Sequence, residues 1–177
     1  YRHSFTFSMH LKRSNVWAKR RYIKIDKFWL FWGFGKDFKK NNVKKFIYAS
    51  TCSVYGVSDT PNVTEEHPLV PITDYNKYKA LCEPVLKKFL DDEFKGVIIR
   101  PATVCGFSEK MRFDLSVNIL TNYAYNKGYI RVFGGKQSRP NIHIDDMCSI
   151  YENLFDRDFS NINGEIFNAG VENLKII

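Results

Sequence analysis

From Lys44 onward, the sequence predicts an α/β fold built on a parallel sheet. Three observations support this prediction: short apolar runs recur, helical patterns alternate with them, and turn residues separate the two. The chain has 177 residues, and domains commonly contain about 100 to 200 residues. One domain, or part of one, is therefore expected.

The first two strands and the helix between them follow from simple patterns. Phe46–Ala49 is an apolar run that predicts a buried strand. A helix is predicted over about 74–92, because Thr73 or Asp74 can cap its first turn. Val97–Arg100 is a second apolar run and predicts the next strand.

The rest of the chain predicts two more helices and three more strands. Apolar residues at helical spacing indicate the helices, and short apolar runs between turn residues indicate the strands. In chain order they are a helix over Leu115–Asn126, strands over Ile130–Phe133 and Asn141–Ile144, a helix from Asp145 to about Phe155, and a last strand over Glu165–Asn168.

The cysteines argue for a reducing compartment. No two of them have the short spacing of a zinc site, and their surroundings are apolar or helical, so neither a metal site nor a disulfide framework is expected. They are Cys52, Cys82, Cys105 and Cys148. No apolar run approaches the roughly 20 residues that span a bilayer, and no signal pattern is present. A cytoplasmic protein that does not enter the membrane is expected.

The positive charge of the chain is confined to its first quarter. Residues 1–45 hold 13 Lys and Arg against 2 Asp and Glu, whereas residues 46–177 hold 14 against 17. Residues 1–40 lack apolar periodicity and contain all three tryptophans. We therefore divide the chain into a basic aromatic segment over 1–40, out of frame or foreign in origin, and an α/β domain over 41–177.

A YxxxK pair is the first sign of chemistry. Tyr75 and Lys79 lie four residues apart at the start of a predicted helix, so both side chains share one face. An ammonium beside a phenol favours the phenolate and would lower the tyrosine pKa, as a general base requires. A surface helix pair is the alternative, and one YxxxK is expected by chance in such a chain.

A hydroxyl residue strengthens the enzymatic interpretation. Thr51 lies 24 residues before Tyr75, directly after a predicted strand. In an open α/β sheet, ligands bind at the carboxyl ends of the strands. The alternative is that Ser50, Thr51 and Ser53 satisfy only local turn hydrogen bonds.

Four motifs in order resemble the extended short-chain dehydrogenase/reductases that modify nucleotide sugars, the NAD-dependent epimerase/dehydratase family. The resemblance covers about 41–177 and implies a Rossmann-like parallel sheet with the catalytic half and part of the substrate-binding region. The motifs are FIYASTCSVYG, PLVPITDYNKYK, IIRPATVCG and RPNIHIDD.

The resemblance implies a catalytic role for each of Thr51, Tyr75 and Lys79. Tyr75 would be the catalytic acid/base, Lys79 would hold the nicotinamide ribose and lower the tyrosine pKa, and Thr51 would hydrogen-bond the reacting sugar hydroxyl. The implied reaction is hydride transfer from a sugar carbon to NAD through a keto-sugar intermediate, in an epimerase or a dehydratase.

Further binding residues are also implied by the resemblance. Pro101 matches the position where the backbone approaches the nicotinamide, and Arg139 matches an arginine that holds the nucleotide diphosphate. The remaining substrate-binding candidates are Ser53, Thr103, Arg112 and Asn118. Many members have Asn at position 103 and Tyr at position 105, so the identity of the sugar stays open. His143 is expected to be structural, and Asp145 and Asp146 to form a helix cap.

The dinucleotide-binding start of the family has no counterpart in the sequence. The family's first βαβ unit carries a GxxGxxG loop, whereas here Gly33 and Gly35 stand alone in FWGFGKD. The N-terminal βαβ unit is thus expected to be missing or incomplete, with weak NAD binding. NAD and NADP are not distinguished, because their discriminator follows the second strand of that unit.

The sequence supports two interpretations of what the protein binds. The resemblance implies a nucleotide-diphosphate sugar as substrate and a homodimer for the intact protein. The alternative is a non-enzymatic nucleic-acid-binding or regulatory protein that uses the basic segment for phosphate contacts and base stacking. We favour the enzyme, because four motifs in order are far more specific than any one of them and Thr51, Tyr75 and Lys79 are all present.

Overall fold

The computed structural model describes residues 36–60 and 62–175. The basic aromatic segment predicted over residues 1–40 therefore lies almost wholly outside the described part. Its last residues, 36–40, form a helical turn. Phe38 of that turn packs against Phe46 and Phe94, with ring centroids 4.7 and 5.9 Å away. This end of the segment thus belongs to the domain core.

The described elements alternate between strands and helices, as the sequence predicts. In chain order they are β1 (Lys45–Ala49), the short 3-10 helix η2 (Cys52–Tyr55), α2 (Asp74–Lys87), β2 (Lys95–Pro101), β3 (Thr103–Cys105), α3 (Ser116–Lys127), β4 (Ser138–His143), α4 (Ile144–Asp156), β5 (Ile166–Ala169) and β6 (Glu172–Lys175).

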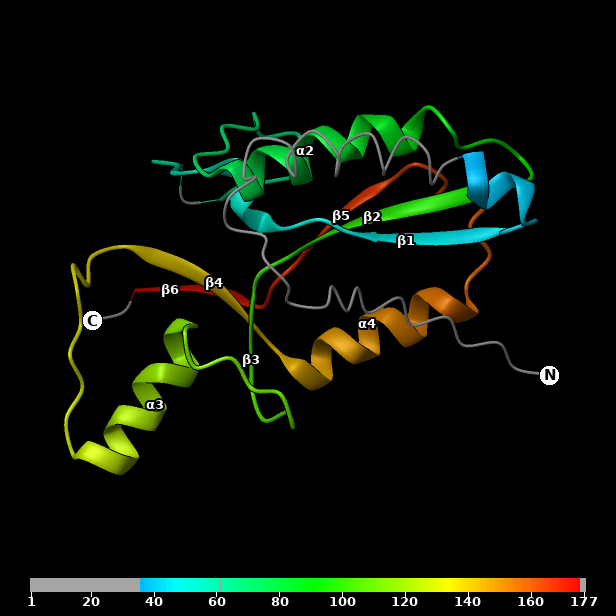
Figure 1. Ribbon diagram of the computed structural model, residues 1–177. Coiled ribbons are helices and arrows are strands. Elements are labelled where there is room, and N and C mark those ends of the chain that lie inside the picture. Colours follow the sequence, from blue (N-terminus) through cyan, green and yellow to red (C-terminus); the bar gives the residue numbers. More distant parts are fainter. Residues whose placement is uncertain (1–35, 61, 176–177) are drawn as a thin grey trace, which may run out of the picture.

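The main sheet is parallel and has the order β1-β2-β5. Figure 1 shows α2 over one face of this sheet and α4 over the other. Because successive side chains of a strand point to opposite faces, β2 supplies both layers. Val97 and Ile99 pack in one core cluster with Met147 and Leu154 of α4. Ile98 packs in the other, on the α2 side.

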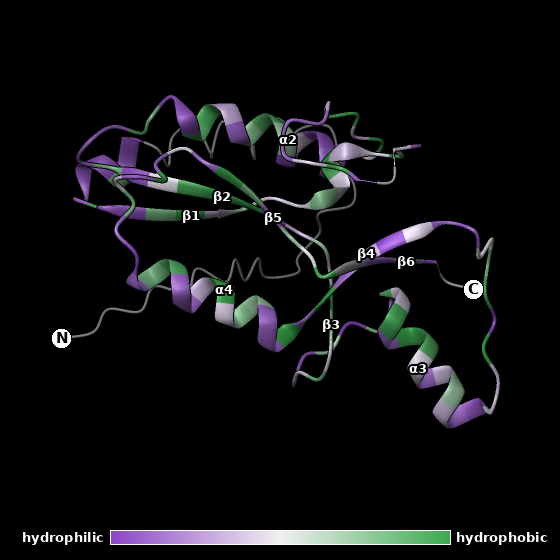
Figure 2. Ribbon diagram, turned by 180° about the vertical axis from the view of Figure 1, so that it is seen from behind, coloured by the Kyte–Doolittle hydropathy of each residue, from purple (hydrophilic) through white to green (hydrophobic). Residues whose placement is uncertain are grey.

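The core on the α2 side ends in polar residues. Tyr48 of β1, Ile98 of β2 and Ile166 of β5 belong to this cluster, and the next residues with the same orientation are Ser50, Arg100 and Asn168. Figure 2 shows the apolar band of β2 between the helices. The polar residues lie where the strands reach their carboxyl ends, the edge at which α/β proteins bind ligands.

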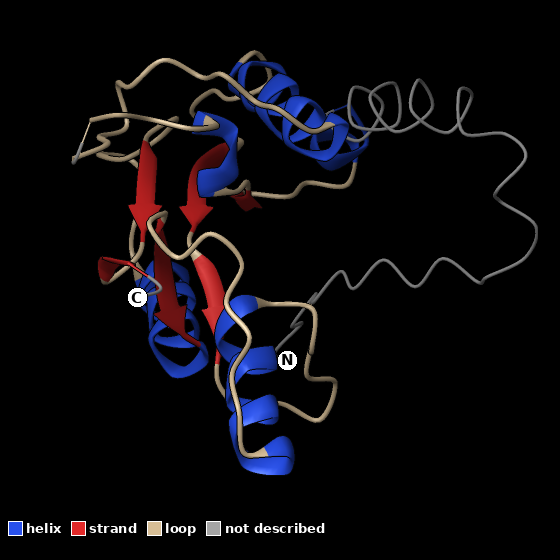
Figure 3. Ribbon diagram, turned by 90° about the vertical axis from the view of Figure 1, so that its left-hand side faces the viewer, coloured by secondary structure: helices blue, strands red, loops and turns tan. Residues whose placement is uncertain are grey.

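A second, smaller sheet has the order β3-β4-β6, in which β3 and β4 are parallel and β4 and β6 antiparallel. Helix α3 has no buried residue and ends at Gly128, whose φ of 70° is the left-handed conformation typical of a helix end. Figures 1 and 3 show α3 at the end of the molecule remote from α2. Along 36–60 and 62–175, no helix is both long and apolar enough to cross a membrane.

Several predicted boundaries were wrong. Helix α2 ends at Lys87 instead of about residue 92, because Asp91 accepts hydrogen bonds from the backbone N–H groups of Glu93 and Phe94 and turns the chain toward β2. The predicted strand at 130–133 is irregular, and Phe133 there is 79% exposed. Strands β3 and β6 were not predicted.

The start of α4 is also capped differently from the prediction. Asp145 was expected to cap this helix, but it lies in the first turn. The Nδ1 atom of His143 instead accepts a hydrogen bond of 3.3 Å from the backbone N–H of Asp145. The histidine therefore closes the end of β4 and begins α4.

Candidate active site

Three of the predicted catalytic residues are carried by η2 and α2, which pack against each other. Thr51 caps η2, and its Oγ1 accepts a hydrogen bond of 3.2 Å from the backbone N–H of Ser53. Thr73 caps α2 by accepting from the backbone N–H of Asn76 at 3.3 Å. Tyr75 therefore lies in the first turn of the helix, where its side chain is 60% exposed.

Lys79 turns inward from α2 and contacts the end of β1. Its Nζ donates a hydrogen bond of 2.5 Å to the carbonyl oxygen of Ala49. The same ammonium lies 5.1 Å from the ring centroid of Tyr48 and 5.8 Å from that of Tyr75. Burial lowers the pKa of Lys79, partly opposed by Cys82. The lysine therefore joins the helix to the strand and faces both aromatic rings.

The expected lowering of the Tyr75 pKa by Lys79 is not found. Partial burial raises the pKa of Tyr75, and the charge that opposes this rise is that of Arg112. The reason is geometric, because the Lys79 ammonium is directed at the Ala49 carbonyl. Arg112 holds Asp114 through two hydrogen bonds of 3.0 and 2.6 Å on the surface.

The predicted substrate-binding residues Arg112 and Asn118 lie at α3 and the loop before it, whereas Thr103 lies on a strand. Asn118 of α3 accepts a hydrogen bond from the backbone N–H of Gly106 at 3.4 Å and donates one of 3.0 Å to the carbonyl oxygen of Arg112. It therefore shapes the loop that brings Arg112 near Tyr75. Thr103 lies in β3 of the second sheet.

Arg139 and Pro101 lie on strands that lead to the same region. Arg139, on β4, is exposed, and its charge acts on the thiol of Cys52, which directly follows Thr51. Burial raises the pKa of Cys52, and Arg139 opposes this rise. Pro101 is the last residue of β2 and pairs with Ala169 of β5.

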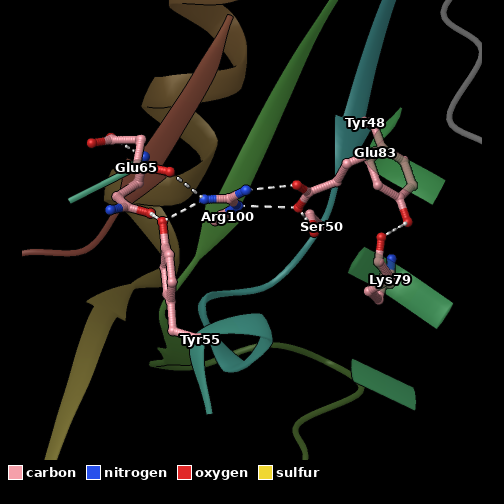
Figure 4. A network of polar contacts seen from close by, with 8 residues as sticks. Tyr48, Ser50, Tyr55, Glu65, Lys79, Glu83 and Arg100 are labelled. Atoms are coloured by element: carbon pink, nitrogen blue, oxygen red, sulfur yellow. Dashed lines mark hydrogen bonds and ion pairs between the residues drawn. The ribbon is translucent and has the colours of Figure 1, made fainter. Parts of the chain in front are cut away.

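Behind these residues lies a buried polar network that the sequence did not lead us to expect. We call it the Arg100 network, and Figure 4 shows most of its members around one guanidinium. Arg100 and Glu83 form an ion pair in which each side chain is 3% exposed. The members are Ser50, Tyr55, Glu65, Glu83, Arg100 and Asn168.

A signal for this network was present in the sequence. Glu83 follows Lys79 by one helical turn and stands between Cys82 and Val85 on an otherwise apolar side of α2. Arg100 ends the apolar run of β2. A charged residue inside an apolar pattern is rarely buried unless it is paired. An ion pair between Glu83 and Arg100 could therefore have been predicted from the sequence.

The chain is similar to proteins of one family along most of its length. Residues 36–170 match the NAD dependent epimerase/dehydratase family. UDP-arabinose 4-epimerase 1 of Arabidopsis thaliana is 41% identical over 59 residues, which cover 33% of this chain and 14% of that protein. UDP-glucose 4-epimerase of Bacillus subtilis is 25% identical over 150 residues, 75% of this chain and 44% of that protein.

A solved structure agrees with the sequence matches. UDP-glucuronic acid 4-epimerase from Bacillus cereus, in complex with UDP-glucuronic acid and NAD, superposes with a TM-score of 0.71 at 26% identity. The match covers 84% of this chain and 47% of that one. The fold is thus Rossmann-like, as the sequence predicts, and the chain spans about half the length of this structural relative.

Proposed function

Because this chain belongs to the NAD dependent epimerase/dehydratase family, we propose that it is the catalytic half of a nucleotide-sugar epimerase or dehydratase. One observation carries the proposal. Tyr75 is 60% exposed at the start of α2, one turn before Lys79, and α2 packs against the short helix that Thr51 caps. A phenol, an ammonium and a hydroxyl thus border the carboxyl end of a parallel sheet.

Each of the three groups has a task that its chemistry permits. The Tyr75 phenolate takes the proton of the reacting sugar hydroxyl, and Thr51 hydrogen-bonds that hydroxyl and orients it. Bound NAD would supply the acceptor for the hydride of the same sugar carbon, and the proton movements at Tyr75 would accompany oxidation of the sugar to a keto form and its later reduction. Burial raises the pKa of Tyr75 and so favours the protonated phenol of the return step, whereas the charge of Arg112 opposes this rise and favours the phenolate of the forward step.

The residues present fit the ribose end of the dinucleotide. An ammonium has three N–H donors, and within 36–60 and 62–175 the Lys79 ammonium donates one hydrogen bond, to the Ala49 carbonyl. Donors therefore remain for ribose hydroxyls. Pro101, the last residue of β2, is proposed to approach the nicotinamide. The pyrophosphate contacts of a GxxGxxG loop are not encoded in residues 1–177, so we propose that the chain alone binds NAD weakly.

The proposed substrate is a nucleoside-diphosphate sugar. The solved relative from Bacillus cereus was obtained with UDP-glucuronic acid. Arg139 is exposed on the side of Thr51 and has the guanidinium fork that suits phosphate oxygens. Arg112 and Asn118, joined through the Arg112 carbonyl, are proposed to face the sugar, together with Ser53 and Thr103.

We also propose that the protein forms a homodimer through α2. Leu81 of this helix is 50% exposed, on the helix that carries Tyr75 and Lys79. An apolar side chain at this position can pack against a second copy of the helix. Sedimentation velocity of the wild type and of Leu81→Glu measures this, and a dimer that survives the charged side chain would contradict it.

Product formation tests the proposed activity directly. The chain is incubated with millimolar NAD and a series of UDP- and dTDP-sugars, and the sugars are separated by chromatography. We expect slow conversion that Tyr75→Phe reduces by about 10² to 10⁴-fold, the usual contribution of acid–base catalysis. Tyr125→Phe, at a tyrosine that is 89% exposed on α3, is the matched control. Equal conversion by Tyr75→Phe and wild type, or none by the wild type at any NAD concentration, would overturn the proposal.

A further inference from the structure

Three hydrogen bonds hold α2 to the end of β1, and one of them runs from the Tyr48 hydroxyl to the carbonyl oxygen of Lys79 at 3.3 Å. Lys79 donates to the carbonyl oxygen of Ala49 at 2.5 Å, and the hydroxyl of Ser50 donates to Oε1 of Glu83 at 2.6 Å. Ala49 and Ser50 are consecutive, and Lys79 and Glu83 are one helical turn apart. Two contacts at this spacing fix both the height and the rotation of the helix relative to the strand.

Arg100 binds Glu83 from the strand next to β1. Its Nε donates to Oε1 of Glu83 at 3.1 Å, and a terminal nitrogen donates to Oε2 at 2.7 Å. Figure 4 shows the guanidinium between the Glu83 carboxylate on one side and Tyr55 and Glu65 on the other. The carboxylate is thus shared by β1, through Ser50, and by β2, through Arg100.

The other end of the guanidinium reaches η2. One terminal nitrogen of Arg100 donates to the hydroxyl oxygen of Tyr55 at 2.7 Å and to the carbonyl oxygen of Glu65 at 3.0 Å. The Tyr55 hydroxyl in turn donates to Oδ1 of Asn168 on β5 at 2.7 Å. Because Tyr55 is the last residue of η2, the helix that Thr51 caps is joined to the same guanidinium as α2.

We propose that Arg100, acting through Glu83 and Tyr55, is a positioning residue that sets the Thr51 hydroxyl against the Tyr75–Lys79 pair. The inference rests on the proposed function, since it takes these three residues to be the reactive set. Arg100 itself is buried behind them and touches no reacting group. Its role is to join the two helices that carry the set.

A purely structural role would not require charges here. Removing two charges from water is costly, and a well-packed apolar pair of similar volume commonly gives equal or greater stability. Apolar residues already fill the rest of this face, with Tyr48 and Ile98 next to Ser50 and Arg100. A planar guanidinium can satisfy several acceptors in fixed directions, which apolar side chains cannot. Compared with an apolar pair, the ion pair therefore adds fixed directions between the elements that it joins.

The proposal predicts how the site responds when the network is changed. Without the Glu83 carboxylate, Ser50 loses its acceptor, and the end of β1 is held to α2 only by the contacts of Lys79 with Ala49 and Tyr48, so its position is fixed less firmly. Lys79 should then leave its buried position, so that its pKa rises toward the ordinary lysine value. The ammonium becomes free to approach the phenol, and the pKa of Tyr75 should fall.

Nuclear magnetic resonance titration of the whole chain, without cofactor or sugar, tests this inference. Lysine is labelled with ¹³C at Cε and tyrosine at Cζ, and the two signals are assigned with Lys79→Arg and Tyr75→Phe. We expect Glu83→Gln and the paired variant Glu83→Leu/Arg100→Met to shift the Lys79 midpoint upward and the Tyr75 midpoint downward. These titrations need no turnover, so their failure is distinguishable from failure of the proposed activity.

The controls separate positioning from stability. Lys39→Gln breaks an ion pair with Asp91 whose side chains are 41% and 47% exposed, and it should leave both midpoints unchanged. A folded paired variant with wild-type midpoints for Lys79 and Tyr75 would overturn the proposal, because a network with only a structural role predicts that result. If neither Glu83 variant folds, Ser50→Ala decides in the same way, since it removes one hydroxyl from the contact.

Discussion

Breaking the buried Glu83–Arg100 ion pair should destabilise the domain far more than breaking the exposed Arg112–Asp114 pair. Both pairs join a guanidinium to a carboxylate by two hydrogen bonds, of 3.1 and 2.7 Å in the first and 3.0 and 2.6 Å in the second. They differ in exposure, at 3% for both buried side chains and 66% for both surface side chains. The two pairs therefore differ in burial and in the further contacts that Glu83 and Arg100 make with Ser50, Tyr55 and Glu65.

The expected magnitudes follow from what each substitution leaves behind. Glu83→Leu leaves a buried guanidinium without its counter-ion and Arg100→Met leaves a buried carboxylate, and each should cost about 3 to 5 kcal/mol. The paired variant leaves no charge, only the Ser50 hydroxyl and the Glu65 carbonyl without partners, at about 1 to 3 kcal/mol each. Asp114→Asn at the surface should cost about 0 to 1 kcal/mol.

Urea unfolding of the four proteins and the wild type at pH 7 measures these values by linear extrapolation. The paired variant should be less destabilised than the sum of Glu83→Leu and Arg100→Met, which is the signature of coupled residues. Additive single effects would refute the reasoning, as would a cost for Asp114→Asn as large as for Glu83→Leu.

Three further predictions concern the core, a helix cap and the acid dependence of stability. Phe159→Ala, at a residue that is 0% exposed in the α4-side cluster, should cost about 3 to 5 kcal/mol in urea, whereas Phe133→Ala at 79% exposure should stay within about 0.5 kcal/mol. Thr73→Ala should cost about 1 kcal/mol through loss of the α2 cap and Thr73→Ser much less, and a loss of equal size in both would contradict the capping role. The hydrogen bond from Lys39, together with backbone N–H groups, lowers the pKa of Asp91 to about 2, so its stabilisation is present above its unfolded pKa of about 4 and is lost as pH falls through about 2. The difference in melting temperature between Asp91→Asn and wild type should shrink over that interval, and a constant difference would count against it.

The main sheet could be predicted from the sequence because burial on both faces leaves a clear pattern. Val97, Ile98 and Ile99 form a continuous apolar run since β2 packs against a helix on either side. The start of helix α2 was likewise predictable, because Thr73 is a residue type that caps helices. The second sheet lacks such a pattern. Strand β3 has only three residues, all partly exposed, so neither length nor alternation reveals it.

Strand β6 was missed for a related reason. Its sequence, ENLK, has one apolar residue in four, and its pairing with β4 depends on tertiary contacts. The opposite error occurred at 130–133, where an apolar run has no partner strand among the described residues. Short runs of this kind specify a strand only when a neighbouring strand supplies the other half of the hydrogen bonds.

The candidate site was predictable as a set of residues but not as a set of interactions. The YxxxK spacing correctly places Tyr75 and Lys79 on α2. The spacing does not reveal that Lys79 donates to Ala49, because that contact depends on how α2 packs against β1. Electrostatics inferred from helical spacing alone therefore assigned the wrong direction to the Tyr75 pKa.

The row of residues that faces α2 explains why the polar network lies where it does. Across β1, β2 and β5 this row is aromatic or aliphatic until the strand ends, and there it changes to Ser50, Arg100 and Asn168. A hydrophobic row would pack equally well to its end, and local stability does not demand the change. The carboxyl edge is also where Thr51 and Lys79 meet the strands. This placement fits the proposed role of the Arg100 network as a rigid support for the Thr51 hydroxyl and the Lys79 ammonium, since catalytic groups misplaced by about 1 Å lose much of their effect.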